Sequence, residues 1–190
     1  KAIEIYNQAL LKYPDSIYYN LEIIDLLIDE KRYNEALELI DKFSKNCTNC
    51  PNIYNSLARI FYRLKNLDEA LRCINLYLNL DKNTAESFYF KGLILNDLNK
   101  FQEAKNSIYN AIKLNPNKAK YYSQMSRSYF NLNELESALL YIKEAIELDN
   151  NEISYKKQAY DIALAIGNKT QILMYENQLK RSEKILRLSR

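Results

Sequence analysis

The stretch Ala36-Leu37-Glu38-Leu39-Ile40 decides the fold, because similar stretches return along the chain at a fixed interval. It recurs as Ala70-Leu71-Arg72-Cys73-Ile74 and as Ala138-Leu139-Leu140-Tyr141-Ile142, and Ala2 and Ala104 fall in the same series. Successive copies are 34 residues apart. A period of this size is the signature of a helical repeat protein in which each unit packs on the next.

Each 34-residue block contains two segments with the apolar spacing of a helix. In block 85–118 the first segment presents Phe88, Gly92 and Leu95, and the second segment presents Phe101 and Ala104. We expect the small residues to let the two helices approach closely, because a larger side chain there would overpack the contact. The chain has only 2 Gly and 3 Pro, so few residues would interrupt helices. The sequence therefore predicts an all-α chain of helix hairpins.

The repeat divides the chain into three parts. Residues 1–16 read as the second helix of a truncated repeat, so we expect a piece of a longer protein. Residues 17–152 hold four full repeats, and 153–190 form a degenerate fifth repeat with a C-terminal capping helix. A terminal repeat needs such a cap because nothing stacks beyond it. We expect helix N-caps at Thr84, Asn117 and Asn150, whose side chains can accept from free backbone N–H groups.

Composition excludes several functions. Because the chain has no His, it can form no Ser-His or Cys-His pair and offers no imidazole for metal binding. The net charge of +3 is too small to indicate nucleic acid or an anionic membrane. No apolar run is long enough to span a bilayer, so we expect a soluble, cytoplasmic protein. We predict no enzyme activity and no cofactor.

The blocks resemble the tetratricopeptide repeat (TPR) family. That family has a large residue at place 4 of its 34-residue unit, a small residue at 8, an aromatic at 11 and Ala at 20. Block 119–152 matches the family pattern with Tyr122, Ser126, Tyr129, Ala138, Ile142 and Ala145. Block 51–84 matches with Tyr54, Ala58, Phe61, Ala70 and Ile74. The resemblance implies a right-handed α-solenoid whose concave groove, lined by the first helix of each unit, binds a peptide segment of a partner protein.

The family's geometry also implies which side chains face the groove, namely those at places 2, 5, 9, 12 and 13. From these we select as candidate partner-binding residues Asn55, Arg59, Tyr62, Arg63, Tyr89, Asn96, Lys120, Ser123, Arg127 and Asn131. The hypothesis is that the Arg and Lys side chains hold carboxylates of the partner, because the Arg fork suits a carboxylate. The alternative is that they are ordinary solvated charges. The residues that clamp chaperone tails in some family members are not reproduced here, so we do not expect that activity.

Other functions stay open from the sequence. The chain is expected to act as an interaction scaffold, but a self-association module or a regulatory arm of a larger protein would use the same repeats. Helical repeats can also read RNA, yet the first helices lack the continuous basic stripe that this requires. Cys47 and Cys50 have the spacing of a redox or half-zinc motif, but with only Cys73 besides them we expect two thiols in a turn. A disulfide between them in an oxidising buffer is the alternative. The basic residues after Lys180 are expected to be the solvated face of the last helix.

Overall fold

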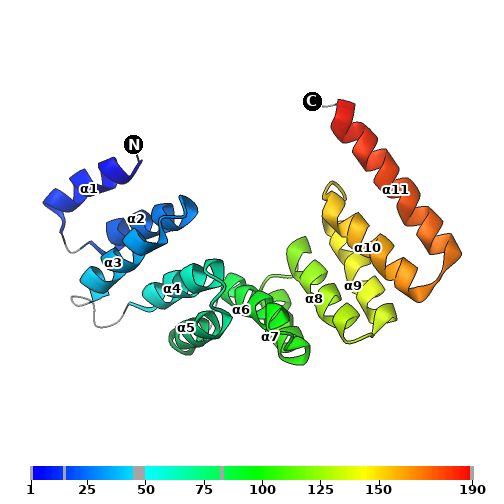
Figure 1. Cartoon of the computed structure of the whole chain (residues 1–190), viewed down its shortest axis with the longest axis horizontal. Coiled ribbons are helices and arrows are strands. Elements are labelled where there is room, and N and C mark those ends of the chain that lie inside the picture. The colour runs from blue at the N-terminus through cyan, green and yellow to red at the C-terminus, as the bar shows by residue number, and fades with distance from the viewer. Residues whose placement is uncertain (1, 15, 45–49, 82–83, 189–190) are drawn as a thin grey trace. The chain divides into compact units, whose positions relative to one another are not determined.

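The computed structural model describes residues 2–14, 16–44, 50–81 and 84–188, with side chains described as far as Lys184 except that of Glu183. These residues form eleven helices and no strand (Figure 1). The chain divides into two compact units, Lys1–Lys82 and Asn83–Arg190. The boundary falls two residues before the end of the predicted repeat 51–84. The two units are defined by packing and not by the sequence repeat. The division into a truncated repeat, four full repeats and a degenerate fifth repeat therefore stays a prediction.

Unit 1 contains a single helix followed by two antiparallel hairpins. Its helices are α1 (Ala2–Lys12), α2 (Ile17–Asp29), α3 (Tyr33–Ser44), α4 (Pro51–Arg63) and α5 (Leu67–Leu80). Within it α2 packs on both α1 and α3, and α4 packs on α2, α3 and α5. Ile24, Ala36 and Ile60 lie at the centre of the core and are fully buried. First helices thus stack on first helices, as the repeat predicts.

Unit 2 continues the same pattern with three hairpins. Its helices are α6 (Ala85–Asp97), α7 (Phe101–Leu114), α8 (Ala119–Asn131), α9 (Leu135–Leu148), α10 (Ile153–Ile166) and α11 (Lys169–Leu188). The two helices of each hairpin pack on each other, and α8 also packs on α6 and α7. Tyr175 of α11 is 2% exposed and joins Leu139, Ile142 and Ile162 in the core. The last helix therefore covers the end of the apolar core, as expected of a cap.

The turn inside each hairpin has the same backbone conformation. Lys31, Lys65, Asn99, Asn133 and Gly167 lie 34 residues apart, and each has a φ angle between 59° and 78°. In the turn at Lys65, the next residue's N–H donates to the carbonyl of Phe61, five residues earlier, at 2.9 Å. That bond defines a Schellman motif, which ends a helix with one left-handed residue. The repeat therefore specifies where the chain reverses as well as which faces are apolar.

The close approach predicted at the small residues is present in the hairpin of α6 and α7. A Cβ atom built on Gly92 would lie 2.4 Å from Cγ1 of Ile108, which is fully buried. Ala58 and Ser126 occupy the same place in their repeats and are also fully buried. The hydroxyl of Ser126 donates to the carbonyl of Ala138 across the hairpin at 2.7 Å. Small residues at this place thus set the distance between paired helices.

The predicted N-caps are wrong at two of three places. Thr84 is the N-cap of α6, although its side chain makes no capping hydrogen bond. Lys118, not Asn117, precedes α8, and Glu152, not Asn150, precedes α10. The carboxylate of Glu152 accepts from the N–H of Ser154 at 3.0 Å. A side chain that follows the asparagines in the loop therefore supplies the cap of α10.

Two further features bear on function. Cys50, which we expected to be a thiol, is disulfide-bonded, whereas Cys73 is a free and buried thiol. Cys47 lies outside the described residues. Within the described part of the chain, none of the helices has the length and apolar character needed to cross a membrane.

Candidate partner-binding surface

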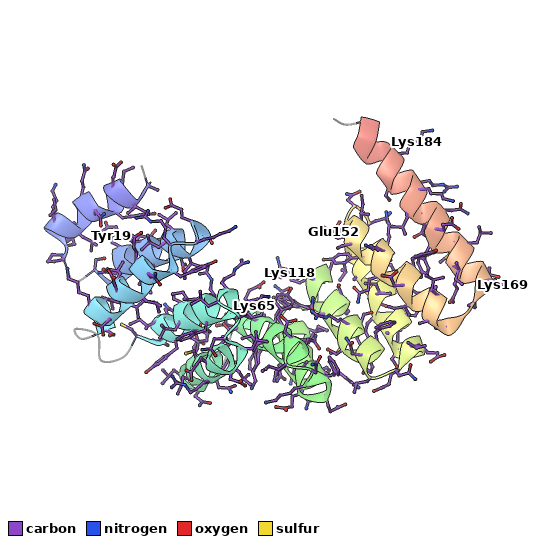
Figure 2. All side chains as sticks on the ribbon, viewed as in Figure 1. Tyr19, Lys65, Lys118, Glu152, Lys169 and Lys184 are labelled. Atoms are coloured by element: carbon purple, nitrogen blue, oxygen red, sulfur yellow. The ribbon has the colours of Figure 1, made fainter. Side chains whose placement is uncertain are left out.

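The side chains predicted to face a partner come from the first helix of each hairpin. We call the exposed face of these helices the first-helix surface, formed in unit 1 by α2 and α4 and in unit 2 by α6, α8 and α10. Figure 2 shows the side chains on the ribbon, with Lys118 and Glu152 labelled at the starts of α8 and α10. Within each unit, the 34-residue period places equivalent residues of neighbouring first helices side by side, as for α2 with α4 and α6 with α8.

In unit 1 the first-helix surface is organised by Arg59. Its guanidinium donates a short hydrogen bond to Asp25 and lies 3.5 Å from a carboxylate oxygen of Asp29. Both acids belong to α2, one turn apart. Burial raises the pKa of Asp25 above its ordinary value, and the nearby Arg59 only partly opposes this effect. Arg59 is therefore already neutralised by two carboxylates of the preceding repeat.

The other predicted residues of unit 1 are less constrained. Asn55 and Tyr62 are half-buried on α4, and Arg63 is exposed at its end. The ammonium of Lys65 lies 5.7 Å from the centre of the Tyr62 ring. Among the described residues, no carboxylate forms an ion pair with Arg63. Arg63 is thus the predicted cation of unit 1 that a partner could reach without breaking an existing pair.

In unit 2 Lys120 is held in a cluster with an acid and two tyrosines. Its Nζ lies 2.6 Å from Oε2 of Glu86, and Oε1 of Glu86 accepts from the hydroxyl of Tyr121 at 2.9 Å. The same Nζ lies 4.9 Å from the ring centre of Tyr89. The rings of Tyr89 and Tyr121 are 5.0 Å apart. Burial, with a smaller contribution from nearby Tyr155 and Glu86, raises the pKa of Tyr89 to about 12.

Further along α8 the polar side chains also bond to neighbouring repeats. Nη2 of Arg127 lies 2.9 Å from Oδ1 of Asp97, whose side chain is only 19% exposed. Asn96 is 1% exposed and accepts from the hydroxyl of Ser128 at 2.8 Å. The hydroxyl of Ser123 donates to Gln158 of α10 at 2.8 Å. Asn96 and Ser123 are consequently buried between repeats and present almost no surface to a partner.

Uncharged side chains remain exposed on the same surface. Phe130 is 37% exposed and Leu164 is 48% exposed, and they occupy the same place in consecutive repeats. Asn131 is exposed next to Phe130, and its Nδ2 donates to the carbonyl of Arg127 at 2.8 Å. The selection from the sequence favoured charged and polar residues, so it left out Phe130 and Leu164. Their shared place in the repeat is the signal that could have identified them.

The acids that neutralise the predicted cations were also missed. Asp25 and Arg59 are 34 residues apart, and so are Glu86 and Lys120. Opposite charges at one place of consecutive repeats can therefore form an ion pair, although Asp29 and Arg63, two described residues that are related in the same way, do not pair with each other. Within the part of the chain that the structure describes, no group of three or more Cys, Asp or Glu is arranged to hold a metal ion.

Comparison with protein families finds one match that covers most of the chain. The sequence model of the ChAPs family (Chs5p-Arf1p-binding proteins) matches residues 15–169. A search of curated proteins finds no match.

Solved structures share the fold at low sequence identity. A double mutant of MamA RS-1 superposes with a TM-score of 0.82 and 16% identity, covering 98% of this chain and 97% of that one. YrrB, described as a TPR protein with an unusual peptide-binding site, has a TM-score of 0.77, 18% identity and coverage of 96% and 94%. The first TPR of Spaghetti (RPAP3), bound to the HSP90 peptide SRMEEVD, has a TM-score of 0.60, 21% identity and coverage of 62% and 94%. The predicted resemblance to the TPR family and the predicted all-α solenoid class are confirmed.

Proposed function

From the premise that this chain belongs to the ChAPs (Chs5p-Arf1p-binding proteins) family, we propose that it is a non-enzymatic scaffold that binds a peptide segment of a partner protein. The proposed site is the first-helix surface. The family's name describes proteins that bind other proteins. Two structures that share the fold, YrrB and the RPAP3 repeat, have descriptions that mention peptide binding. These likenesses support a protein or peptide partner.

One observation carries the proposal: side-chain bonds between neighbouring repeats hold the first helices in place. Arg59 joins α4 to α2, Lys120 joins α8 to α6, and Ser123 joins α8 to α10. A surface that is already ordered loses little conformational entropy when a peptide binds, which favours affinity. These hydrogen bonds lie on the first-helix surface and not only in the core. They therefore fix the geometry of that surface and also stabilise the fold.

The proposal includes the absence of catalysis and a cytoplasmic location. The absence of His leaves carboxylates, Lys and Tyr as the available acid–base groups. On the first-helix surface Glu86, Lys120 and Tyr121 are engaged with one another. The disulfide of Cys50 is typical of an oxidising compartment and is the observation against a cytoplasmic location. Fractionation of cells that express the protein would test the location.

The experiment that tests peptide binding starts from a random peptide library displayed on phage and selected on the immobilised chain. Selected peptides, made synthetically with a fluorescent label, are then titrated with the chain and followed by anisotropy. We expect saturable binding, and we expect backbone amide shifts in NMR spectra to concentrate on α8 and α10 or on α4. Shifts confined to second helices would contradict the proposed site, and a library that yields no binding peptide would contradict the function.

Self-association is a second candidate function, and exposed apolar residues on second helices favour it. Leu140 of α9 and Leu173 of α11 are each 59% exposed, and Met174 is 41% exposed. Exposed large apolar side chains are a common feature of interfaces. Light scattering across a range of protein concentrations would test this candidate. A mass that stays that of one chain at all concentrations would count against it, and a dimer that L173D disrupts would support it.

A further inference from the structure

The charges of unit 2 restrict which kind of partner its first-helix surface can bind. Its groove-facing positions carry three acids, Glu86, Asp97 and Asp161, and three cations, Lys120, Arg127 and Lys157. Two of the cations are paired with acids of the preceding repeat, at 2.6 Å for Lys120 and 2.9 Å for Arg127. The surface is therefore neutral in sum. Lys157 and Asp161 of α10 are exposed, and among the described residues neither forms an ion pair.

A charged partner would have to compete with these pairs. An acidic segment that bound Arg127 would place its own carboxylate close to the negative charge of Asp97, whose side chain is 19% exposed. A basic segment that bound Glu86 would displace Lys120 from the carboxylate and from the Tyr89 ring. Exchanging one partly exposed ion pair for another gains a partner little free energy, because such pairs contribute little net free energy. These two internal pairs thus offer little to partners of either sign.

Exposed apolar side chains on this surface offer a partner a contact that does not compete with the internal ion pairs. Phe130 and Leu164 are large, are exposed by 37% and 48%, and occupy equivalent places on α8 and α10. The two helices are fixed against each other by reciprocal bonds, because Ser123 donates to Gln158 and Gln158 donates to the Ser123 carbonyl at 3.1 Å. Contact with a partner would remove apolar area from water at both residues, which is favourable whatever the salt concentration.

We propose that the first-helix surface of unit 2 binds an uncharged partner segment through two large apolar side chains, one against Phe130 and one against Leu164. The amide of Asn131 supplies a polar contact beside Phe130, since its Nδ2 bond to Arg127 leaves Oδ1 to accept from a partner backbone N–H. This inference rests on the proposed function and replaces the earlier hypothesis that Lys120 and Arg127 hold partner carboxylates.

The phage selection described above, carried out on the whole chain, tests this inference by the composition of the peptides it yields. We expect peptides without net charge that contain two large apolar residues. Affinity of the best synthetic peptide should fall about tenfold or more in F130S and in L164S, as for central interface residues. It should change less than about threefold between low and high salt, because surface charge contacts are the interactions that salt screens.

Matched controls separate a binding effect from a folding effect. L140S and L173S remove exposed leucines of second helices, and both should leave peptide affinity unchanged. Circular dichroism melts should show that F130S remains folded, and F130N provides a second polar variant if it does not. Acidic peptides whose binding weakens with salt would overturn this inference while leaving the scaffold function intact. Apolar peptides that bind F130S and L164S normally would also overturn it, and failure to select any peptide would contradict both proposals.

Discussion

Lys120 of α8 forms an ion pair with Glu86 of α6 at 2.6 Å, and the two residues occupy the same place in consecutive repeats. Asp25 and Arg59 are related in the same way in unit 1. Because one period separates the partners, each pair bridges two neighbouring first helices. The repeat of 34 residues therefore aligns not only apolar faces but also opposite charges.

A double-mutant cycle on this pair should give a small coupling energy. Side chains of Lys120 and Glu86 are 42% and 54% exposed, so we expect a coupling of about 0.5–1 kcal/mol between E86Q and K120M in urea unfolding. The coupling should shrink when salt is raised, because exposed pairs are screened. As a control, Lys180 and Glu176 form a pair within α11, and changes there should show no coupling to Lys120. A coupling that grows with salt would contradict this account.

Gly92 should be hard to replace even though alanine is the better helix former. G92A gains about 1 kcal/mol of helix propensity but places Cβ 2.4 Å from Cγ1 of Ile108, and overpacking costs about 1–3 kcal/mol. We therefore expect a lower free energy of unfolding, measured in urea. The sign should reverse in the I108A background, where the contacting atom is absent and only the gain in propensity remains. If G92A destabilised both backgrounds equally, the contact with Ile108 would not be the cause.

Replacing the left-handed lysine in a hairpin turn should increase the stability of the protein. Lys65 has a φ of 63°, a left-handed conformation that costs a non-glycine residue about 1–2 kcal/mol. K65G should therefore raise the melting temperature, and K65N should do so by a smaller amount. The matched control is Asn133, whose φ is 59°, because N133K should lower stability by reversing the same exchange. Equal melting temperatures for all these variants would show that the turn conformation carries no cost.

Two buried tyrosines should respond in opposite ways to loss of the hydroxyl. Among the described residues, the hydroxyl of Tyr175 has no hydrogen-bond partner, and burying such a group costs about 1–3 kcal/mol. Y175F should therefore stabilise the protein. The hydroxyl of Tyr77 donates to Asp81 at 3.1 Å in a similarly buried position, so Y77F should destabilise it. Thermal melts of both variants against the parent chain provide the measurement, and destabilisation by Y175F would contradict the prediction.

Tyr89 should link stability to alkaline pH. Burial raises its pKa to about 12 in the folded protein, above the ordinary value of 10.0. A group with a raised pKa favours the folded state while protonated, so its contribution is complete below pH ~10 and is lost as pH rises toward ~12. Unfolding free energies measured across this interval should fall more steeply for the parent chain than for Y89F. Identical slopes would show that Tyr89 has no such effect.

The repeat predicted most of the fold because its period is carried by packing requirements. Small residues such as Gly92 and the regular 34-residue spacing of the alanines can be identified directly in the sequence, since each small residue must fit against a paired helix. The loop ends were predicted less well. Asparagines lie near the starts of α8 and α10, but each helix begins after a later residue of the loop. In α10 that residue, Glu152, is the N-cap.

Polar residues at place 4 of the 34-residue repeat show where the repeat pattern did not predict the packing. Asn20 and Lys156 stand where the repeat calls for a large apolar residue, yet both are buried. Asn20 donates to the Ser16 carbonyl at 2.9 Å, and Lys156 donates to the Ser182 hydroxyl at 2.9 Å. The partner of Asn20 is local, at the N-cap of its own helix, whereas the partner of Lys156 depends on the position of α11, which the local sequence does not reveal.

The proposed binding surface was the part least accessible from the sequence. Its positions follow from the family's geometry, but the availability of a cation there depends on how its side chain packs against the neighbouring helix. Arg59 and Arg63 each have an aspartate one repeat earlier. Arg59 nevertheless engages both aspartates, and Arg63 is exposed. Comparison of equivalent places in the sequence therefore could not distinguish the two arginines.

The polar bridges of unit 2 each reach only to an adjacent hairpin, as from Glu86 to Lys120 and from Ser123 to Gln158. Strain introduced at one end consequently has no direct mechanical route to hairpins beyond its neighbour. Pulled from its terminus, this part of the protein should yield one hairpin at a time, which would let it lengthen under load while the remaining hairpins keep their structure.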